Sequence, residues 1–328
     1  MNDELRSRNH TPFDGTMEAL SKWLVWLACS ATILIAVERG YEGAWYQLGT
    51  MIHRPEMAPP AFGYRLLFPF FAARLERLVP ALTDHNSFIA TQVPIIALTV
   101  YLLGKWASLF LRKFGWLLGF SMAALMLCPT IGYWTFYDIA ITGFWTACLL
   151  LLYDDRPVSY LLVFALATLN HENILLLVPC AVLYFWRHLK PWKLALFGAA
   201  QILAWCCMRY MVISIVPAGP VFDSRVRYNL TFWRNYSLHA MFFSAMILIP
   251  WWMLAFKGWR YAPLILRCAA LSFPGLILVT FLFGKFDESR QFDAFIPTTI
   301  GLIACWANYH MGVAEAIETP IASSEVAT

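Results

Sequence analysis

Long apolar runs, separated by short polar segments, recur along the whole chain. About 20 apolar helical residues cross a bilayer core of about 30 Å, and ten runs are candidates for such spans. They cover residues 20–37, 87–104, 116–133, 139–153, 158–170, 173–186, 194–216, 238–256, 262–283 and 292–309. Only 13% of the residues are charged, against about 25% in an ordinary soluble protein. The chain therefore predicts an all-α polytopic membrane protein and excludes a soluble globule, a disordered chain and a repeat solenoid.

The lysines predict the orientation of these spans. With the N-terminus in the cytoplasm, six of the seven lysines fall on the inner side or at inner helix ends, as the positive-inside rule expects. Two short spans, 158–170 and 173–186, meet at Asn170-His171-Glu172. Joining them into one broken helix would invert every later loop and worsen the lysine pattern, so we expect two separate spans. The expected location of the protein is the bacterial inner membrane.

The longest segment between spans, residues 38–86, is predicted to lie on the outer face. Within it, residues 66–82 have apolar positions at helical spacing, interrupted by arginine and glutamate. This pattern is typical of an amphipathic helix in the membrane interface. We therefore expect about ten transmembrane helices with interfacial helices in the first outer loop. Residues 1–310 would form a single transmembrane domain, and residues 311–328 a disordered cytoplasmic tail.

Arginine departs from the lysine pattern, because nine of the seventeen arginines map to the outer face. Arginine can form two parallel hydrogen bonds with phosphate or carboxylate, and it tolerates apolar surroundings better than lysine does. Anion binding is therefore one interpretation. Interfacial snorkelling is the other, and we favour it for Arg74 and Arg77. Arg209 is predicted to lie about 10 Å below the outer end of its helix. An unpaired charge is costly there, and Glu172 is its expected partner.

Polar residues of the outer segments form the predicted functional site. They converge from five separate segments, whereas the inner loops are short and chemically plain. The candidate residues are Glu38, Glu42, Tyr64, Arg65, Asp138, His171, Glu172, Arg225, Arg227, Glu288 and Arg290. Structural roles are the alternatives: Glu38 can cap the interface, Asp138 can favour the dipole of the helix it opens, and Glu288 can pair with Arg290. The sequence has no HxxxH or DxD spacing, so no metal site is assigned.

Three short stretches resemble motifs of membrane glycosyltransferases of the GT-C fold. Phe62-Gly63-Tyr64-Arg65-Leu66-Leu67-Phe68-Pro69 is similar to a Tyr-Arg-x-x-x-Pro stretch of bacterial relatives, and Asn170-His171-Glu172 is similar to their Asn-Arg-Glu turn. Glu288-Ser289-Arg290, followed by Pro297, is similar to their late Glu-x-Arg…Pro segment. The long first outer loop and the arginine-rich later loops extend the resemblance in layout over most of the chain.

The resemblance implies a cell-envelope enzyme that transfers a sugar, with inversion, from a polyprenyl-phosphate donor to a lipid, glycan or protein acceptor. A carboxylate would take the acceptor proton. Arginine or a divalent metal would stabilise the departing phosphate, and no other cofactor is implied. The base of that fold is usually an aspartate of the first outer loop, but residues 38–65 contain none. Glu42 is therefore the expected base, with Glu38 as second choice. The arginines expected on the phosphate are Arg65, Arg225, Arg227 and Arg290.

Two other functions are alternatives to transfer of a sugar. A non-catalytic transporter, flippase or assembly subunit for a polysaccharide or lipid would carry polar residues through both halves of the bilayer, whereas the inner halves of these spans are apolar. An outer-face acyltransferase using His171 is the third interpretation. The net charge of +4, without a basic run, gives no argument for nucleic acid, so no nucleic-acid partner is expected. The expected partners are therefore the lipid-linked donor and membrane lipid.

Overall fold

The computed structural model describes residues 12–40, 45–57, 65–131, 138–216, 225–231, 249–284 and 289–311. Within these ranges every regular element is a helix and no strand occurs, which confirms the all-α prediction. The predicted tail over 311–328 lies outside the described residues, apart from its first residue.

The helices follow the predicted apolar runs closely. The long elements are α1 (Pro12–Gly40), α5 (Asp84–Ser108), α6 (Gly115–Leu127), α7 (Asp138–Tyr153), α8 (Pro157–Asn170), α10 (Pro191–Ile215), α15 (Phe273–Phe283) and α16 (Ile296–His310). The shorter ones are α2 (Trp45–His53), η1 (Pro55–Met57), α4 (Leu67–Leu78), η2 (Cys128–Thr130), η3 (Glu172–Leu176), α9 (Leu177–Phe185), α11 (Val226–Leu230), η4 (Trp259–Tyr261), α14 (Leu264–Ala270) and η5 (Ser289–Phe295).

Four described helices are long and apolar enough to cross a membrane. They are Thr16–Gly40, Asp84–Ser108, Pro191–Ile215 and Leu264–Phe283. Four further apolar helices, between residues 115 and 185, are shorter. Four long apolar helices are compatible with a membrane protein, while the predicted total of about ten spans stays a prediction.

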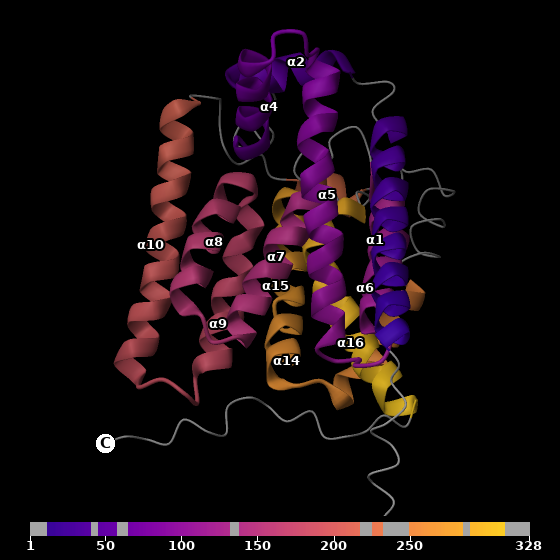
Figure 1. The fold of residues 1–328 in the computed structure, drawn as a ribbon. Helices are drawn as coiled ribbons and strands as arrows, with labels where there is room; N and C mark the ends of the chain where they lie inside the picture. Colours follow the sequence, from indigo (N-terminus) through magenta and orange to yellow (C-terminus); the bar gives the residue numbers. More distant parts are fainter. Residues whose placement is uncertain are drawn as a thin grey trace, which may run out of the picture.

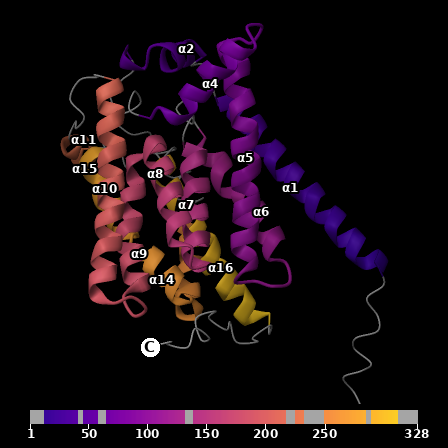
Figure 2. The same cartoon turned by 60° about the vertical axis from the view of Figure 1, so that its left-hand side comes forward.

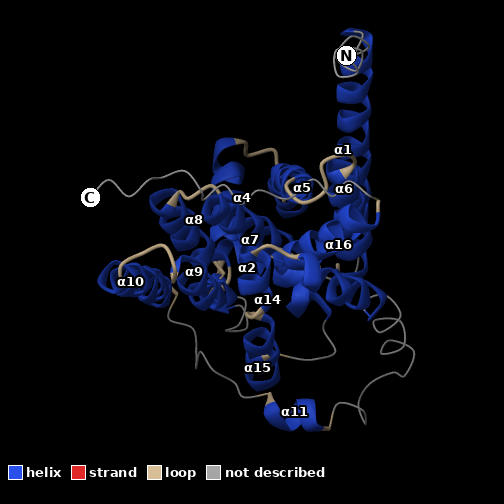
Figure 3. Cartoon of the chain, turned by 90° about the horizontal axis from the view of Figure 1, so that it is seen from below, coloured by secondary structure: helices blue, strands red, loops and turns tan. Residues whose placement is uncertain are grey.

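The helices form one bundle with α7 at its centre. α7 packs between α5 and α8, and α8 in turn packs on α10 (Figure 1). α1 lies at the edge against α5 and α6, on the side away from α10 (Figures 1 and 3). Most side chains described on α1 are exposed, including Trp23, Leu24 and Leu27, each at least 50% accessible. Lipid accepts such an apolar surface, which water would not.

One end of the bundle carries α2, α4 and the α8–α9 turn. α2 lies across this end, with α4 beneath it (Figure 2). The α5–α6 and α9–α10 connections lie at the opposite end (Figure 1). α4 confirms the helix predicted within 66–82, and it exposes Phe70, Phe71 and Leu78. α8 and α9 are separate helices, as expected, because the extended backbone of His171 (φ −157°, ψ 133°) ends α8.

Side chains far apart in sequence are joined by hydrogen bonds inside the bundle. The Trp106 indole N–H at the end of α5 donates to the Pro297 carbonyl oxygen at 2.8 Å. On α7, the Thr142 hydroxyl donates to the Asp293 backbone oxygen at 2.9 Å. These bonds attach the region around the start of α16 to the centre of the bundle, where an unpaired polar group would be costly.

A close helix–helix approach at Gly119 gives a first prediction. A Cβ atom at this position of α6 would lie 2.6 Å from the Gly104 Cα atom of α5 and would also meet the Leu103 backbone oxygen. Small residues allow such close backbone contact between membrane helices. We expect Gly119→Ala to push α5 and α6 apart and to lower the free energy of unfolding by about 1–3 kcal/mol.

Thermal unfolding of the purified protein in detergent measures this loss. Leu125→Ala is the matched control, because Leu125 lies on the same helix with 52% of its surface exposed. Equal melting temperatures for the two variants would contradict the close approach.

Candidate functional site

Three charged or titratable side chains converge on Glu172, at the turn between α8 and α9. The Arg65 Nη2 atom, from the segment before α4, donates a hydrogen bond to Glu172 Oε1 at 3.1 Å. The Arg209 Nη1 atom, from α10, lies 3.8 Å from Glu172 Oε2, and the His171 Nδ1 atom lies 3.9 Å from the same oxygen. Segments 65, 171–172 and 209 therefore meet at one carboxylate, and the predicted pairing of Arg209 with Glu172 is confirmed.

The backbone of the turn fixes the orientation of this cluster. The His171 Nδ1 atom accepts a hydrogen bond from the Asn173 backbone N–H at 3.2 Å, which caps η3. The Trp205 indole N–H on α10 donates to the Glu172 backbone oxygen at 3.3 Å. Residues 205 and 209 are four apart, so they share one face of α10. This face therefore holds both the backbone and the carboxylate of Glu172.

The two arginines of the cluster lie in a poorly solvated place. The Arg65 and Arg209 residues are 6% and 7% exposed, whereas the Glu172 side chain is 37% exposed. The two buried guanidinium groups thus approach the same carboxylate, as a buried cation needs an opposite charge close by. Guanidinium groups beside a partly exposed carboxylate offer the donors that bind phosphate or carboxylate anions.

Electrostatics keep Glu172 ionised. Burial acts to raise the pKa of the Glu172 carboxyl, but the positive charges of Arg65 and Arg209, with the Arg65 hydrogen bond, outweigh it and hold this pKa well below its usual range. A carboxylate with so low a pKa is a weak proton acceptor near neutral pH. Glu172 is therefore suited to position the arginines rather than to take a proton.

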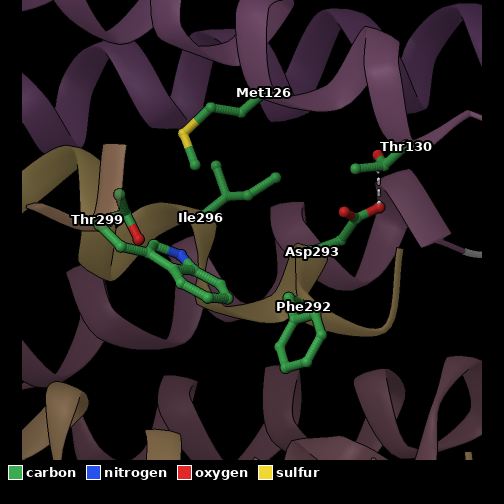
Figure 4. A pocket seen from close by; sticks show the side chains of 7 residues that line it. Met126, Thr130, Phe292, Asp293, Ile296 and Thr299 are labelled. Atoms are coloured by element: carbon green, nitrogen blue, oxygen red, sulfur yellow. Dashed lines mark hydrogen bonds between the residues drawn. The ribbon is translucent and has the colours of Figure 1, made fainter. Parts of the chain in front are cut away.

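A second polar group surrounds Asp293 in η5, which is 1% exposed. The Thr130 hydroxyl donates to Asp293 Oδ2 at 3.1 Å, as Figure 4 shows. The adjoining pocket has room for no more than about one water molecule. It is lined by Met126, Thr130, Trp252, Phe292, Asp293, Ile296 and Thr299. Ligand pockets usually exceed about 300 Å³. This pocket is small and largely apolar, so the Glu172 cluster is the better candidate site.

The structure brings together only part of the predicted site. Arg65, His171 and Glu172 meet, and Arg209 joins them. Asp138 is buried as the first residue of α7. Glu38 is exposed near the end of α1.

The remaining predicted residues lie beyond this cluster or outside the described part. Arg225 is half-buried before α11, and Arg227 is exposed on α11. The Asn229 amide of α11 donates to the Phe281 and Gly284 carbonyl oxygens at 2.8 and 2.9 Å, which ties α11 to the end of α15. Three residues, Glu42, Tyr64 and Glu288, lie outside the described residues. Arg290 belongs to η5, but its side chain is not among those described.

Two features of the site were not predicted from the sequence. Trp205 carries no charge and lies in an apolar run, so nothing marks its hydrogen bond to the turn. Asp293 gives a usable signal, because it is a carboxylate at the start of an apolar run, where an ionisable group requires a partner. Its partner Thr130 lies 163 residues away in the chain.

The described chain thus defines an all-helical protein with four candidate membrane spans and a buried arginine–glutamate–arginine cluster at one end. No protein-family model, curated protein or solved structure matches the chain.

Proposed function

We propose that the protein is a membrane glycosyltransferase that moves a sugar from a polyprenyl-phosphate donor to a lipid, glycan or protein acceptor at the outer face. The observation that carries this proposal is the meeting of Arg65, Arg209 and His171 around Glu172. The cluster lies at the end of the bundle that also bears α2 and α4. A polyprenyl-phosphate donor offers an anion of the kind that guanidinium groups bind.

The proposed topology has about ten spans in the bacterial inner membrane, with the N-terminus in the cytoplasm. In this topology α2 and α4 lie at the outer surface. The exposed Phe70, Phe71 and Leu78 side chains of α4 support this placement, because an interfacial helix buries such a face among the lipid acyl chains. An isoprenoid tail in the membrane would then enter beside α4, close to Arg65.

In the proposed reaction, an acceptor hydroxyl attacks the anomeric carbon of the sugar, and the bond from that carbon to the phosphate oxygen breaks. The phosphate leaves with the lipid and takes the negative charge. Arg65 and Arg209 stabilise that charge. The hydroxyl proton passes to Glu42, or to Glu38 as second choice. Glu172 positions the two guanidinium groups, because its low pKa makes it a weak base.

Transfer is tested with membranes that contain the protein and radiolabelled polyprenyl-phosphate sugars, followed by analysis of the products. We expect labelled product from the wild type, and a loss of at least about 100-fold for Glu42→Gln, or for Glu38→Gln if that residue is the base. Glu18→Gln, an exposed carboxylate on α1, is the control and should keep full activity.

Undiminished transfer by the Glu38→Gln/Glu42→Gln double variant would remove the assignment of the base. Movement of labelled lipid across proteoliposomes without any product would favour the flippase alternative.

A further inference from the structure

His53, Glu76 and Asp84 form a second cluster at the same end of the bundle, on three different helices. The His53 Nε2 atom, in the last turn of α2, lies 3.0 Å from Glu76 Oε2 on α4 and 3.2 Å from Asp84 Oδ1 at the start of α5. One ligand atom from each residue lies within 4.8 Å of the others. We propose that these three residues bind one divalent cation of the zinc class, independently of the lipid-phosphate site.

The donor set and its spacing fit such an ion. Zinc binds imidazole nitrogen and carboxylate oxygen at about 2.0–2.2 Å, so two ligands of a tetrahedral site lie about 3.3 Å apart. The separations at His53 of 3.0 and 3.2 Å are close to that value. Two carboxylates and a neutral imidazole carry a charge of −2, which a divalent cation balances.

Hydrogen bonding alone accounts for the cluster less well. The Nε2 atom of His53 bears one proton at most, yet two carboxylate oxygens approach it. A single N–H would have to be shared between them. A metal ion accepts a lone pair from the nitrogen and from both oxygens at once.

The surroundings hold both carboxylates in place. The Ser87 hydroxyl, on the first turns of α5, donates to the other oxygen of Glu76. Such outer contacts orient the ligands of metal sites. Gly49 of α2 leaves room for Asp84, because a Cβ atom there would meet Asp84 Oδ2. Gly49 is four residues before His53, so the two share one face of α2.

One side of the cluster is open. The His53 and Asp84 side chains are 49% and 45% exposed, whereas that of Glu76 is 12% exposed. Three protein ligands with solvent on one side leave a fourth position for water, as in catalytic zinc sites. Bound metal would join α2 and α4 to the start of α5 and so fix the outer helices on the bundle.

The test is zinc binding by the purified full-length protein, without a polyhistidine tag and stripped with a chelator. Competition against a chromophoric zinc chelator gives the stoichiometry and affinity, and X-ray absorption gives the ligands. We expect one tight zinc per chain, with one nitrogen and about three oxygens near 2.0 Å.

Asp84→Asn and His53→Ala should each weaken zinc binding by at least about 10-fold, as should Gly49→Ala by displacing Asp84. Glu56→Gln, an exposed carboxylate close by in η1, is the control.

A second measurement guards against variants that fail to fold. Zinc should raise the melting temperature of the wild type and of Glu56→Gln, but not that of Asp84→Asn, whose own melting temperature without zinc shows whether it is folded. Manganese and magnesium, each added alone, report the selectivity of the site.

The proposal is overturned if the wild type binds no zinc, or if the variant His53→Ala/Glu76→Gln/Asp84→Asn binds it as tightly as Glu56→Gln does. Transfer activity is not the readout, so failure here leaves the proposed reaction untouched.

Discussion

Glu172→Gln is expected to lower the free energy of unfolding by about 3 kcal/mol. The substitution leaves the buried Arg65 and Arg209 without their shared carboxylate. Removing one partner of a fully buried ion pair costs about 3–5 kcal/mol, and we expect the lower end because the Glu172 side chain is 37% exposed. Thermal unfolding in detergent measures the loss, and Glu18→Gln on α1 is the control.

Two further measurements sharpen this prediction. In the folded protein the pKa of Glu172 is lowered, so its contribution is present above the unfolded value near 4.5 and is lost only as the pH falls through the lower folded value. The stability difference between wild type and Glu172→Gln should therefore persist across the neutral pH range and shrink only in strong acid. Adding Arg209→Gln to Glu172→Gln should restore part of the stability, because it removes one of the two buried guanidinium groups that face Glu172 in the wild type. A double variant less stable than Glu172→Gln alone would show that Arg209 is not held by this charge pair.

Arg65→Ala is expected to have the largest effect on donor use, with a loss of transfer of about 100- to 1000-fold. Arg65 is the buried cation that hydrogen-bonds Glu172 directly, and in the proposed reaction it faces the charge that develops on the leaving phosphate. Arg65→Lys keeps the charge but loses the planar fork of donors. We therefore expect it to fold like the wild type while losing about 10-fold in donor affinity.

Arg74→Ala is the control for Arg65. Arg74 is an exposed residue of α4 that lies 5.0 Å from the centre of the Phe70 ring. Its removal should leave transfer and donor binding within about twofold of the wild type, because its expected place is at the interface. Both values are read from the same assay with labelled donor over a range of concentrations. If Arg65→Ala and Arg74→Ala behaved alike, the phosphate would have to bind elsewhere.

The helices follow from the sequence because a lipid-facing helix needs a long run of apolar residues, and such runs are visible without any structure. The end of α4 was predicted too late. The segment predicted as helical runs to residue 82, but the helix ends at Leu78, two residues before Pro80, since the residue before a proline is disfavoured in a helix. The number of spans does not follow, because the short apolar helices α6 to α9 fall below the length that identifies a crossing by itself.

The site could be predicted from the sequence only where a single residue requires a partner of opposite charge. Arg209 sits in an apolar run and must have a carboxylate partner, so its pairing with Glu172 could be inferred. That Arg65 approaches Glu172 to 3.1 Å depends on how α4 packs against α8. His53, Glu76 and Asp84 share no sequence spacing, because they occupy three separate helices. Tertiary packing alone brings them together.

The hydrogen bonds from Trp106 and Thr142 to residues 297 and 293 have a consequence for biosynthesis. Both donors emerge from the ribosome long before their acceptors are made. Until residues 293–297 are translated, these two donors lack the acceptors that they have in the folded protein. We therefore expect the packing of α5 and α7 to be completed only after the region around the start of α16 has been synthesised, rather than helix by helix.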